Sequence, residues 1–333
     1  METAAFDCPK RMQYGPCGGV EFDGTCEVAD HACVFLETPT VRWSGRPPSV
    51  AAGGMRDLLR QRQVVIADFP ARALSSTSIA EVGGILRGSV DAVLAGDSGA
   101  ERVQFSPAYR ASLIQQQGLG VWSGLTCRDR NRVALEGELA ALAEVGVAGV
   151  HCVTGDHTDT GSRPDAQPVF DLDSTRLAAL ASDAGHLVSV AESPCAPPTS
   201  RRAERLAEKV RAGADVCFVN HAGGAAPVAA FIREAQDHGA AVAFIPCVPL
   251  VVDVASARLL QSFTTLVLPT GYLERILEAS DPFAEGVAAA VDLSQRLLAI
   301  DGVRGVNLSG GAGPGGALRF AEALAEVGAT LIS

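Results

Sequence analysis

The sequence predicts an eight-stranded (β/α)8 barrel preceded by a small cysteine-rich module, and three observations lead to this prediction. From residue 55 onward, apolar runs of strand length alternate with longer segments of helical periodicity. Eight such units in about 270 residues match the usual size of this barrel. Four of the nine cysteines lie in the first tenth of the chain, before the first unit.

The predicted strands are continuous apolar runs, as expected for parallel strands that helices cover. Each run is followed by Gly, Pro, Ser or Asp and then by a stretch rich in Ala, Leu, Glu and Arg. An open doubly wound sheet is the alternative, because a sequence does not show whether a sheet closes. The runs occupy residues 64–70, 90–96, 120–127, 148–156, 186–193, 215–222, 241–249 and 302–310.

The N-terminal segment is too short to build a core of its own. In CPKRMQYGPCGGVEFDGTCEVADHACVF, the thiols of Cys8, Cys17, Cys26 and Cys33 are separated by intervals of nine, nine and seven residues. Four thiolates suit tetrahedral zinc, and metal binding can supply the missing folding free energy. His31 is an alternative ligand, and reduced thiols packed against the barrel are the alternative to a metal site.

These features divide the chain into three parts. Residues 1–36 form the predicted zinc module, residues 37–54 a linker rich in Pro, Gly and Ser, and residues 55–333 the barrel. The later thiols of Cys127, Cys152, Cys217 and Cys247 fall in apolar runs and are expected to be small buried side chains.

Composition excludes several classes of function. The net charge of -11 gives no basis for binding nucleic acid. No apolar stretch reaches the roughly 20 residues that span a bilayer, and the start METAAFDCPKR lacks a secretory core, so we expect a cytoplasmic protein. Oligomeric state is left open, with a homo-oligomer or a complex with other enzymes as the options.

In a (β/α)8 barrel, polar residues at the carboxyl ends of the strands surround the active site. The Gly-rich stretch NLSGGAGPGGALRF after the last strand is either a phosphate-binding loop or a flexible closing loop. The strand-end candidates are Asp68, Asp97, Thr126, Arg128, Arg130, Asp156, His157, Glu192, Asn220 and His221.

Two sets of motifs resemble a known family. CPKRMQYGPCGG followed by DGTCEV resembles the zinc-containing module that accompanies methylenetetrahydrofolate reductases of acetogens and related bacteria, as a subunit or a fused domain. VDAVLAGDSGA, GLTCRDRNRVAL, VTGDHTDTG, QPVFDLDS and EKVRAGAD resemble consecutive blocks of the same reductases in the same order. The resemblance covers the chain from Cys8 to about residue 250 and is weaker beyond.

The resemblance implies a reductase that passes hydride from NADH or NADPH through FAD to 5,10-methylenetetrahydrofolate and yields 5-methyltetrahydrofolate. Asp156 matches the family carboxylate beside flavin and folate, and Lys209 matches a cofactor-binding lysine. The further cofactor-binding candidates are Thr126, Arg128, Arg130 and Gly155, and Asp97 and Asn220 are the substrate-binding candidates. Asp129 is expected to pair with Arg128 or Arg130.

The sequence departs from the family pattern at several of these positions. The family Glu that acts as general acid corresponds to Ala67, and Asp68 would replace it only if the strand end shifts, because neighbouring strand residues face opposite sides. His157 and Glu192 are further candidates for the proton donor. Asn220 stands where the family has Gln. Gly96, Gly124, Ser193 and Pro197 replace other residues of better-known members.

Three functions are compatible with this pattern. The leading hypothesis is reduction of methylenetetrahydrofolate or a closely related folate redox reaction. A repurposed or flavin-free folate enzyme of one-carbon transfer is the second, favoured by Ala67. A non-catalytic folate-binding subunit is the third, and retention of Asp156 argues against it.

Overall fold

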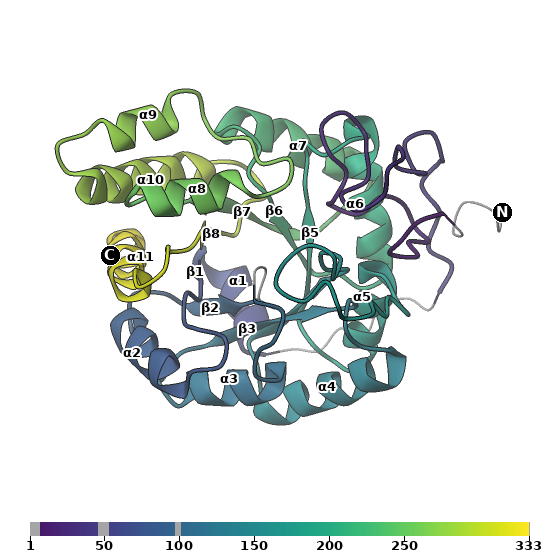
Figure 1. Cartoon of the computed structure of the whole chain (residues 1–333), viewed down its shortest axis with the longest axis horizontal. Coiled ribbons are helices and arrows are strands. Elements are labelled where there is room, and N and C mark those ends of the chain that lie inside the picture. Colours follow the sequence, from purple (N-terminus) through teal and green to yellow (C-terminus); the bar gives the residue numbers. More distant parts are fainter. Residues whose placement is uncertain (1–6, 46–52, 97–100, 333) are drawn as a thin grey trace.

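Eight parallel strands close into a barrel in the computed structural model, which describes residues 7–45, 53–96 and 101–332 (Figure 1). Each strand pairs with its neighbours in chain order, and β8 closes the ring on β1. The prediction of a (β/α)8 barrel is therefore confirmed, and the open sheet is excluded. The strands are β1 Val64–Asp68, β2 Ala92–Ala95, β3 Val121–Thr126, β4 Gly149–Val153, β5 Val188–Glu192, β6 Val216–Val219, β7 Ala243–Pro249 and β8 Gly305–Ser309.

Helices alternate with the strands and form the outer layer (Figure 1). None of those in the described ranges is long and apolar enough to cross a membrane. The helices are α1 Met55–Gln61, α2 Ser76–Leu86, α3 Pro107–Gln115, α4 Arg132–Val145, α5 Ser174–Asp183, the 3-10 turn η1 Thr199–Arg201, α6 Arg202–Arg211, α7 Ala225–Asp237, α8 Val254–Gln261, α9 Tyr272–Leu277, α10 Pro282–Leu298 and α11 Ala317–Ile332.

Side-chain caps fix where several of these helices begin. Ser75, Asn131, Asp173 and Asp281 each accept a backbone N–H from the first turn of the helix that follows. Asp253 forms a capping box with the third residue of α8. Each cap satisfies donors that a helix leaves unpaired at its start, and so fixes the residue at which that helix begins.

Two apolar cores hold the barrel together. The larger core packs the outward faces of the strands against the helices and includes Val65 and Ala67 of β1. The smaller one fills the barrel interior and includes Ile66, Trp122 and Phe218, with α1 packed against it. Because side chains alternate along a strand, Asp68 shares the inward face with Ile66.

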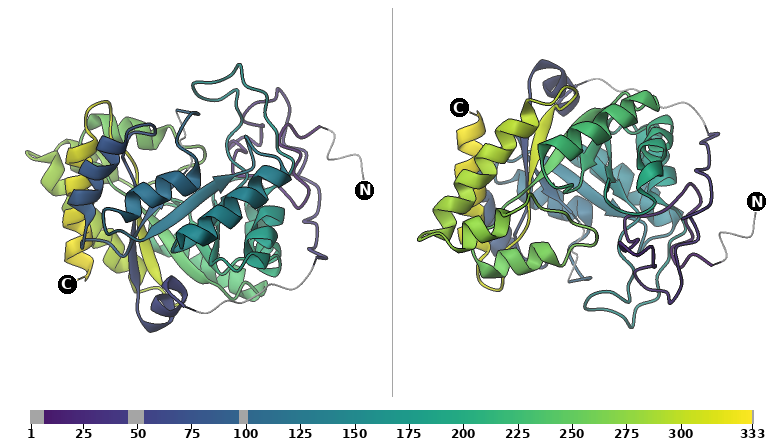
Figure 2. Two further views of the ribbon diagram at one scale, coloured as in Figure 1. Left: turned by 90° about the horizontal axis from the view of Figure 1, so that it is seen from below. Right: turned by 90° about the horizontal axis from the view of Figure 1, so that it is seen from above.

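The cysteine-rich segment lies against the barrel at the end opposite α1. Figure 2 shows residues 7–45 beside the loop that joins β4 to α5. Two isolated antiparallel bridges, Val20↔Cys26 and Thr25↔Ala32, organise the segment, and Met12, Val20 and Phe35 are its buried apolar side chains. So few apolar residues cannot fold such a segment alone. The division at residues 36 and 54 stays a prediction.

Candidate active site

A cavity of about 750 Å³ lies between the carboxyl ends of the barrel strands and the N-terminal segment. The volume is in the range of small-molecule sites. Its barrel wall includes Thr126, Asp156, Glu192, Asn220 and Ser309. Its opposite wall comes from residues before position 30, among them Lys10, Met12, Cys17 and Glu27. The site therefore combines strand ends with a segment far away in sequence.

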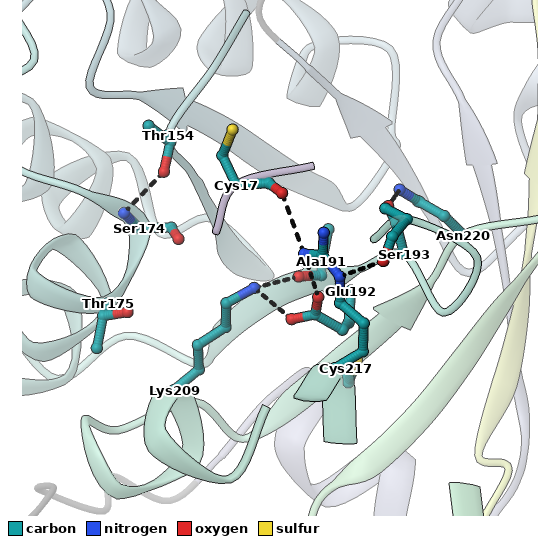
Figure 3. A network of polar contacts seen from close by, with 12 residues as sticks. Cys17, Thr154, Ser174, Thr175, Ala191, Glu192, Ser193, Lys209, Cys217 and Asn220 are labelled. Carbon is teal, nitrogen blue, oxygen red and sulfur yellow. Dashed lines mark hydrogen bonds and ion pairs between the residues drawn. The ribbon is translucent and has the colours of Figure 1, made fainter. Parts of the chain in front are cut away.

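Glu192 at the end of β5 is the centre of a buried ion cluster (Figure 3). Its Oε2 lies 2.7 Å from Lys209 Nζ, and its Oε1 lies 3.3 Å from Nη1 of Arg202. Lys209 Nζ also donates to the carbonyl of Ala191, at 2.6 Å. Burial alone would raise the pKa of Glu192, but Lys209 and Arg202 outweigh burial and hold that pKa below its usual value. Glu192 is therefore an ionised partner of two cations and a poor proton donor.

Asp68 faces the barrel interior without any shift of the strand end. Its Oδ1 accepts a hydrogen bond of 2.9 Å from Asn307 Nδ2, and its Oδ2 accepts one of 3.1 Å from the Gly310 N–H. The outward residue is Ala67, which packs in the outer core. Burial raises the pKa of Asp68, although these hydrogen bonds oppose the shift. Asp68 therefore keeps its proton to a higher pH than an ordinary aspartic acid.

Asp156 lies on the loop after β4, with its side chain in the cavity and largely exposed. Its Oδ2 is 3.8 Å from Nη1 of Arg102. The guanidinium of Arg102 also donates to the carbonyl of His157 and the hydroxyl of Thr160, so it ties the loop together. This carboxylate is therefore accessible to a ligand.

His157 has a buried ring that does not line the cavity. The ring stacks on Phe170, with centroids 5.7 Å apart, and Nδ1 accepts the Asp159 N–H at 3.2 Å. Gly155 does line the cavity; it has a φ of 91°, and an added Cβ would stand 3.0 Å from Thr126 Cβ. Only glycine adopts that backbone beside Thr126 without strain.

The TCRDRNR stretch places Thr126 and Arg128 in the cavity wall, but not Arg130. Arg128 binds its neighbour Asp129 through two hydrogen bonds, of 2.8 and 2.7 Å. The predicted pairing of Asp129 with Arg128 is confirmed. Cofactor binding by Thr126, Arg128, Arg130 and Gly155 stays a prediction.

Asn220 and His221 follow β6 and both line the cavity. Asn220 Nδ2 donates to Ser193 Oγ at 2.7 Å (Figure 3). Burial lowers the pKa of His221 to about 4 against a smaller opposing effect of the Cys247 backbone, so the ring is neutral. Asp97, the other substrate-binding candidate, lies outside the described residues.

Lys10, Glu27, Arg202 and Asn307 are site residues that sequence reasoning did not select. Lys10 forms an ion pair with Glu27, and both side chains are buried. In the sequence, Lys10 lies two residues after Cys8 and Glu27 directly follows Cys26. Only the fold brings these two side chains to the strand ends. The Pro-rich turn before Arg202 carried no signal of burial.

The four N-terminal cysteines converge on a second, much smaller cavity, of about 20 Å³, which His31 also lines. All four thiols are free. Burial raises the pKa of Cys33 to about 11, and the neighbouring thiols add to the shift. In the ranges the structure describes, no group of three or more His, Cys, Asp or Glu side chains is arranged closely enough to hold a metal ion.

Comparison with known sequences decides the family. A family model described as "Methylenetetrahydrofolate reductase" matches residues 92–309, more than half of the chain. The chain belongs to the methylenetetrahydrofolate reductase family. A second model, "Methylene-tetrahydrofolate reductase C terminal", matches residues 3–41. A segment described as C-terminal in these reductases thus stands before the barrel here. None of the curated proteins compared with the chain matches it.

Two solved structures resemble the chain to different degrees. An uncharacterised Clostridium thermocellum protein that binds two copies of 5-methyl-5,6,7,8-tetrahydrofolic acid has a TM-score of 0.58 and 13% identity, covering 81% of this chain and 97% of its own. Oxaloacetate acetylhydrolase, in complex with oxalate, has a TM-score of 0.48 and 12% identity over 79% and 82% of the two chains. The match to the Clostridium protein, at 13% identity, shows a shared fold only.

Proposed function

We propose that the chain reduces 5,10-methylenetetrahydrofolate to 5-methyltetrahydrofolate with reduced nicotinamide as the hydride donor. Family membership supports a folate-related one-carbon reaction. The observation that carries the proposal is the cavity at the strand ends, in which the Asp156 carboxylate is exposed. The Clostridium neighbour, which has a similar fold and binds 5-methyl-5,6,7,8-tetrahydrofolic acid, also supports a folate ligand.

Asp68 is the proposed general acid. Opening of the imidazolidine ring needs a proton on the departing nitrogen, while hydride arrives at the methylene carbon. The buried carboxyl has a raised pKa and shares a face of the barrel with Asn307. Asp68 does not itself line the cavity, but Ser309, which forms a hydrogen bond with Asp68, does and so links the acid to the site. Asp156 is the carboxylate that orients the folate. His157 and Glu192, which are stacked or ion-paired, fit a donor role less well.

FAD fits the site poorly at Lys209, the lysine that the resemblance implies for cofactor binding. Enzymes of this family typically use FAD and a nicotinamide donor. Here Lys209, which the resemblance identifies as a cofactor-binding lysine, is buried and already bound by Glu192 and the Ala191 carbonyl. The carboxylate of Glu192 thus already pairs with the Lys209 ammonium group that a diphosphate would need as its partner. This ion pair favours a flavin-free folate enzyme, in which hydride would pass from the nicotinamide directly to the folate, and no step above involves flavin.

Zinc fits the cysteine cluster by its donors. Four thiols and one imidazole face a single cavity, and zinc commonly binds four such ligands. We propose Cys8, Cys17, Cys26 and Cys33 as the ligands of a structural zinc, although these side chains are not at ligand distances here. The metal would hold together a segment with few buried apolar side chains.

An anaerobic absorbance experiment tests the proposed reaction. The purified protein is mixed with NADH or NADPH, first alone and then with methylenetetrahydrofolate, and absorbance is followed at flavin and nicotinamide wavelengths. Folate-dependent oxidation of the nicotinamide without a flavin spectrum is the expected result. A flavin spectrum that bleaches on mixing would restore the FAD route. No oxidation with either nicotinamide, after reconstitution with FAD, would contradict the reductase proposal.

A further inference from the structure

The N-terminal segment contacts the barrel near two of the strand ends that surround the site. Thr154 Oγ1, directly after β4, lies 3.6 Å from Met12 Sδ. Three residues further on, the His157 N–H donates to Glu27 Oε1 at 3.2 Å. Asp156 stands between these two contacts. The N-terminal segment therefore holds the short piece of loop that presents the exposed carboxylate.

Glu27 is held in place from several sides. Its carboxylate forms an ion pair with Lys10, and the two side chains are 8% and 5% exposed. Its own N–H donates to the carbonyl of Gly19, at 3.1 Å. A Cβ built on Gly19 would stand 1.9 Å from Glu27 Oε2. The buried pair has little room to move, so its hydrogen bond to His157 has a defined position.

A second contact anchors the same segment to the end of β5. Arg202 Nη1 donates to the carbonyl of Cys17 at 3.0 Å, and this guanidinium also binds the Glu192 carboxylate (Figure 3). The buried Glu192 cluster and the cysteine-rich segment are thereby connected through one side chain. Displacing the segment would remove a partner from a buried cation, which is costly.

We propose that the N-terminal segment forms one wall of the substrate site and contributes to ligand binding. In this proposal Glu27 is a positioning residue, which fixes the loop 154–157 and thereby the carboxylate of Asp156. The role of Asp156 rests on the proposed function; the contact itself does not. Carboxylate hydrogen bonds to backbone N–H groups are stronger than neutral ones. A loop with one exposed acid, bound on both sides, is preorganised for a ligand.

Hydrogen exchange measured by mass spectrometry on the full-length protein tests the contact directly. Glu27→Ala removes the acceptor of the His157 N–H, and we expect exchange in residues 154–161 to accelerate about tenfold or more. Glu27→Gln keeps an acceptor oxygen but loses the ion pair with Lys10, so a smaller acceleration is expected. Unchanged exchange in β7 shows that the barrel itself is intact.

Two neighbouring glycines provide a matched pair for the same experiment. Gly19→Ala pushes against the Glu27 carboxylate, whereas a Cβ on Gly18 meets only Ser193 Oγ at 3.7 Å. Neither glycine has a left-handed backbone. Gly19→Ala should loosen the 154–161 loop, and Gly18→Ala should leave its exchange as in the parent protein.

Binding of 5-methyltetrahydrofolate, followed by calorimetry, tests the consequence for the ligand. We expect the Kd to rise about tenfold in Glu27→Ala, with a smaller rise in Glu27→Gln. Wild-type exchange of the loop in both Glu27→Ala and Gly19→Ala would overturn the proposal, and so would faster exchange with an unchanged Kd. If the parent protein binds no folate, the proposed function fails, while the exchange data still decide whether Glu27 fixes the loop.

Discussion

Lys209 Nζ lies 2.7 Å from Oε2 of Glu192, and the Glu192 side chain is only 1% exposed. The pair joins α6 to the end of β5 and shares its carboxylate with Arg202. A buried ion pair of this kind depends on both partners, because removing one leaves the other charged and without compensation.

The first prediction concerns the stability of this cluster. Glu192→Gln should lower the free energy of unfolding by about 3–5 kcal/mol, since two buried cations lose their counter-ion. Urea denaturation measures the effect. Glu136→Gln is the matched control, because the Arg132–Glu136 pair is exposed and its loss should lie within error. Equal stability of Glu192→Gln and the parent protein would contradict the ion cluster.

The second prediction concerns Asp68 as the acid. Asp68→Asn should lower kcat by about 10²–10⁴. Because burial raises the pKa of Asp68, the active protonated form is present below that pKa and is lost as pH rises through it. The wild-type rate should therefore fall on the alkaline side of this pKa, and the variant should lose that limb. Asp165→Asn, at an exposed ion pair, is the control and should keep the wild-type profile.

The third prediction concerns acid stability. Burial lowers the pKa of His221 to about 4 in the folded protein, whereas the unfolded chain takes up its proton near 6.5. Stability from this residue is therefore present above pH 6.5 and decreases as pH falls toward 4. Uptake of one proton by the unfolded chain lowers the free energy of unfolding by about 1.4 kcal/mol per pH unit, or roughly 2 kcal/mol between pH 6.5 and 5.

His221→Phe removes this titration and keeps the ring. Urea unfolding at pH 6.5 and pH 5 should show a drop that is smaller in His221→Phe than in the parent by about that amount. His238→Phe is the control, because this histidine is exposed at the end of α7. The same drop in His221→Phe and the parent would show that His221 takes up its proton normally in the fold.

Sequence patterns predicted the barrel because each strand is a local apolar run whose length and composition do not depend on distant residues. All eight predicted runs contain the observed strands, from β1 at 64–68 to β8 at 305–309. The caps Asp173 and Asp253 are likewise local, since a side chain bonds an N–H two or three residues away. Such local patterns predict structure without any knowledge of contacts between distant residues.

The site was harder to predict because its contacts join residues far apart. Lys209 looks like an exposed helical lysine, and only the packing of α6 on β5 shows that Glu192 binds it. The prediction that Ala67 faces the barrel interior was wrong, and Asp68 faces it instead. The inward face of a strand depends on its register in the sheet, which cannot be read from the sequence alone. The pairing of Glu27 with the His157 N–H, 130 positions apart, has no local signal at all.

The last prediction concerns the cysteine cluster, where sequence and fold agree on the donors but a metal is still a proposal. Cys33→Ser removes one thiol that lines the small cavity and does not line the large one. Elemental analysis should find about one zinc per chain in the parent protein and much less in the variant, because a serine hydroxyl is a poor zinc ligand.

Cys195→Ser is the matched control for the cysteine cluster, because Cys195 is a free, partly buried thiol outside it, and this variant should keep its zinc. Loss of zinc should also lower the melting temperature, since metal binding contributes directly to folding of so small a segment. A parent protein purified without chelators that holds no zinc and takes none up on titration would leave the four thiols as packed side chains. The segment would then be held on the barrel by its direct contacts, among them the hydrogen bonds of Glu27 with His157 and of Arg202 with Cys17.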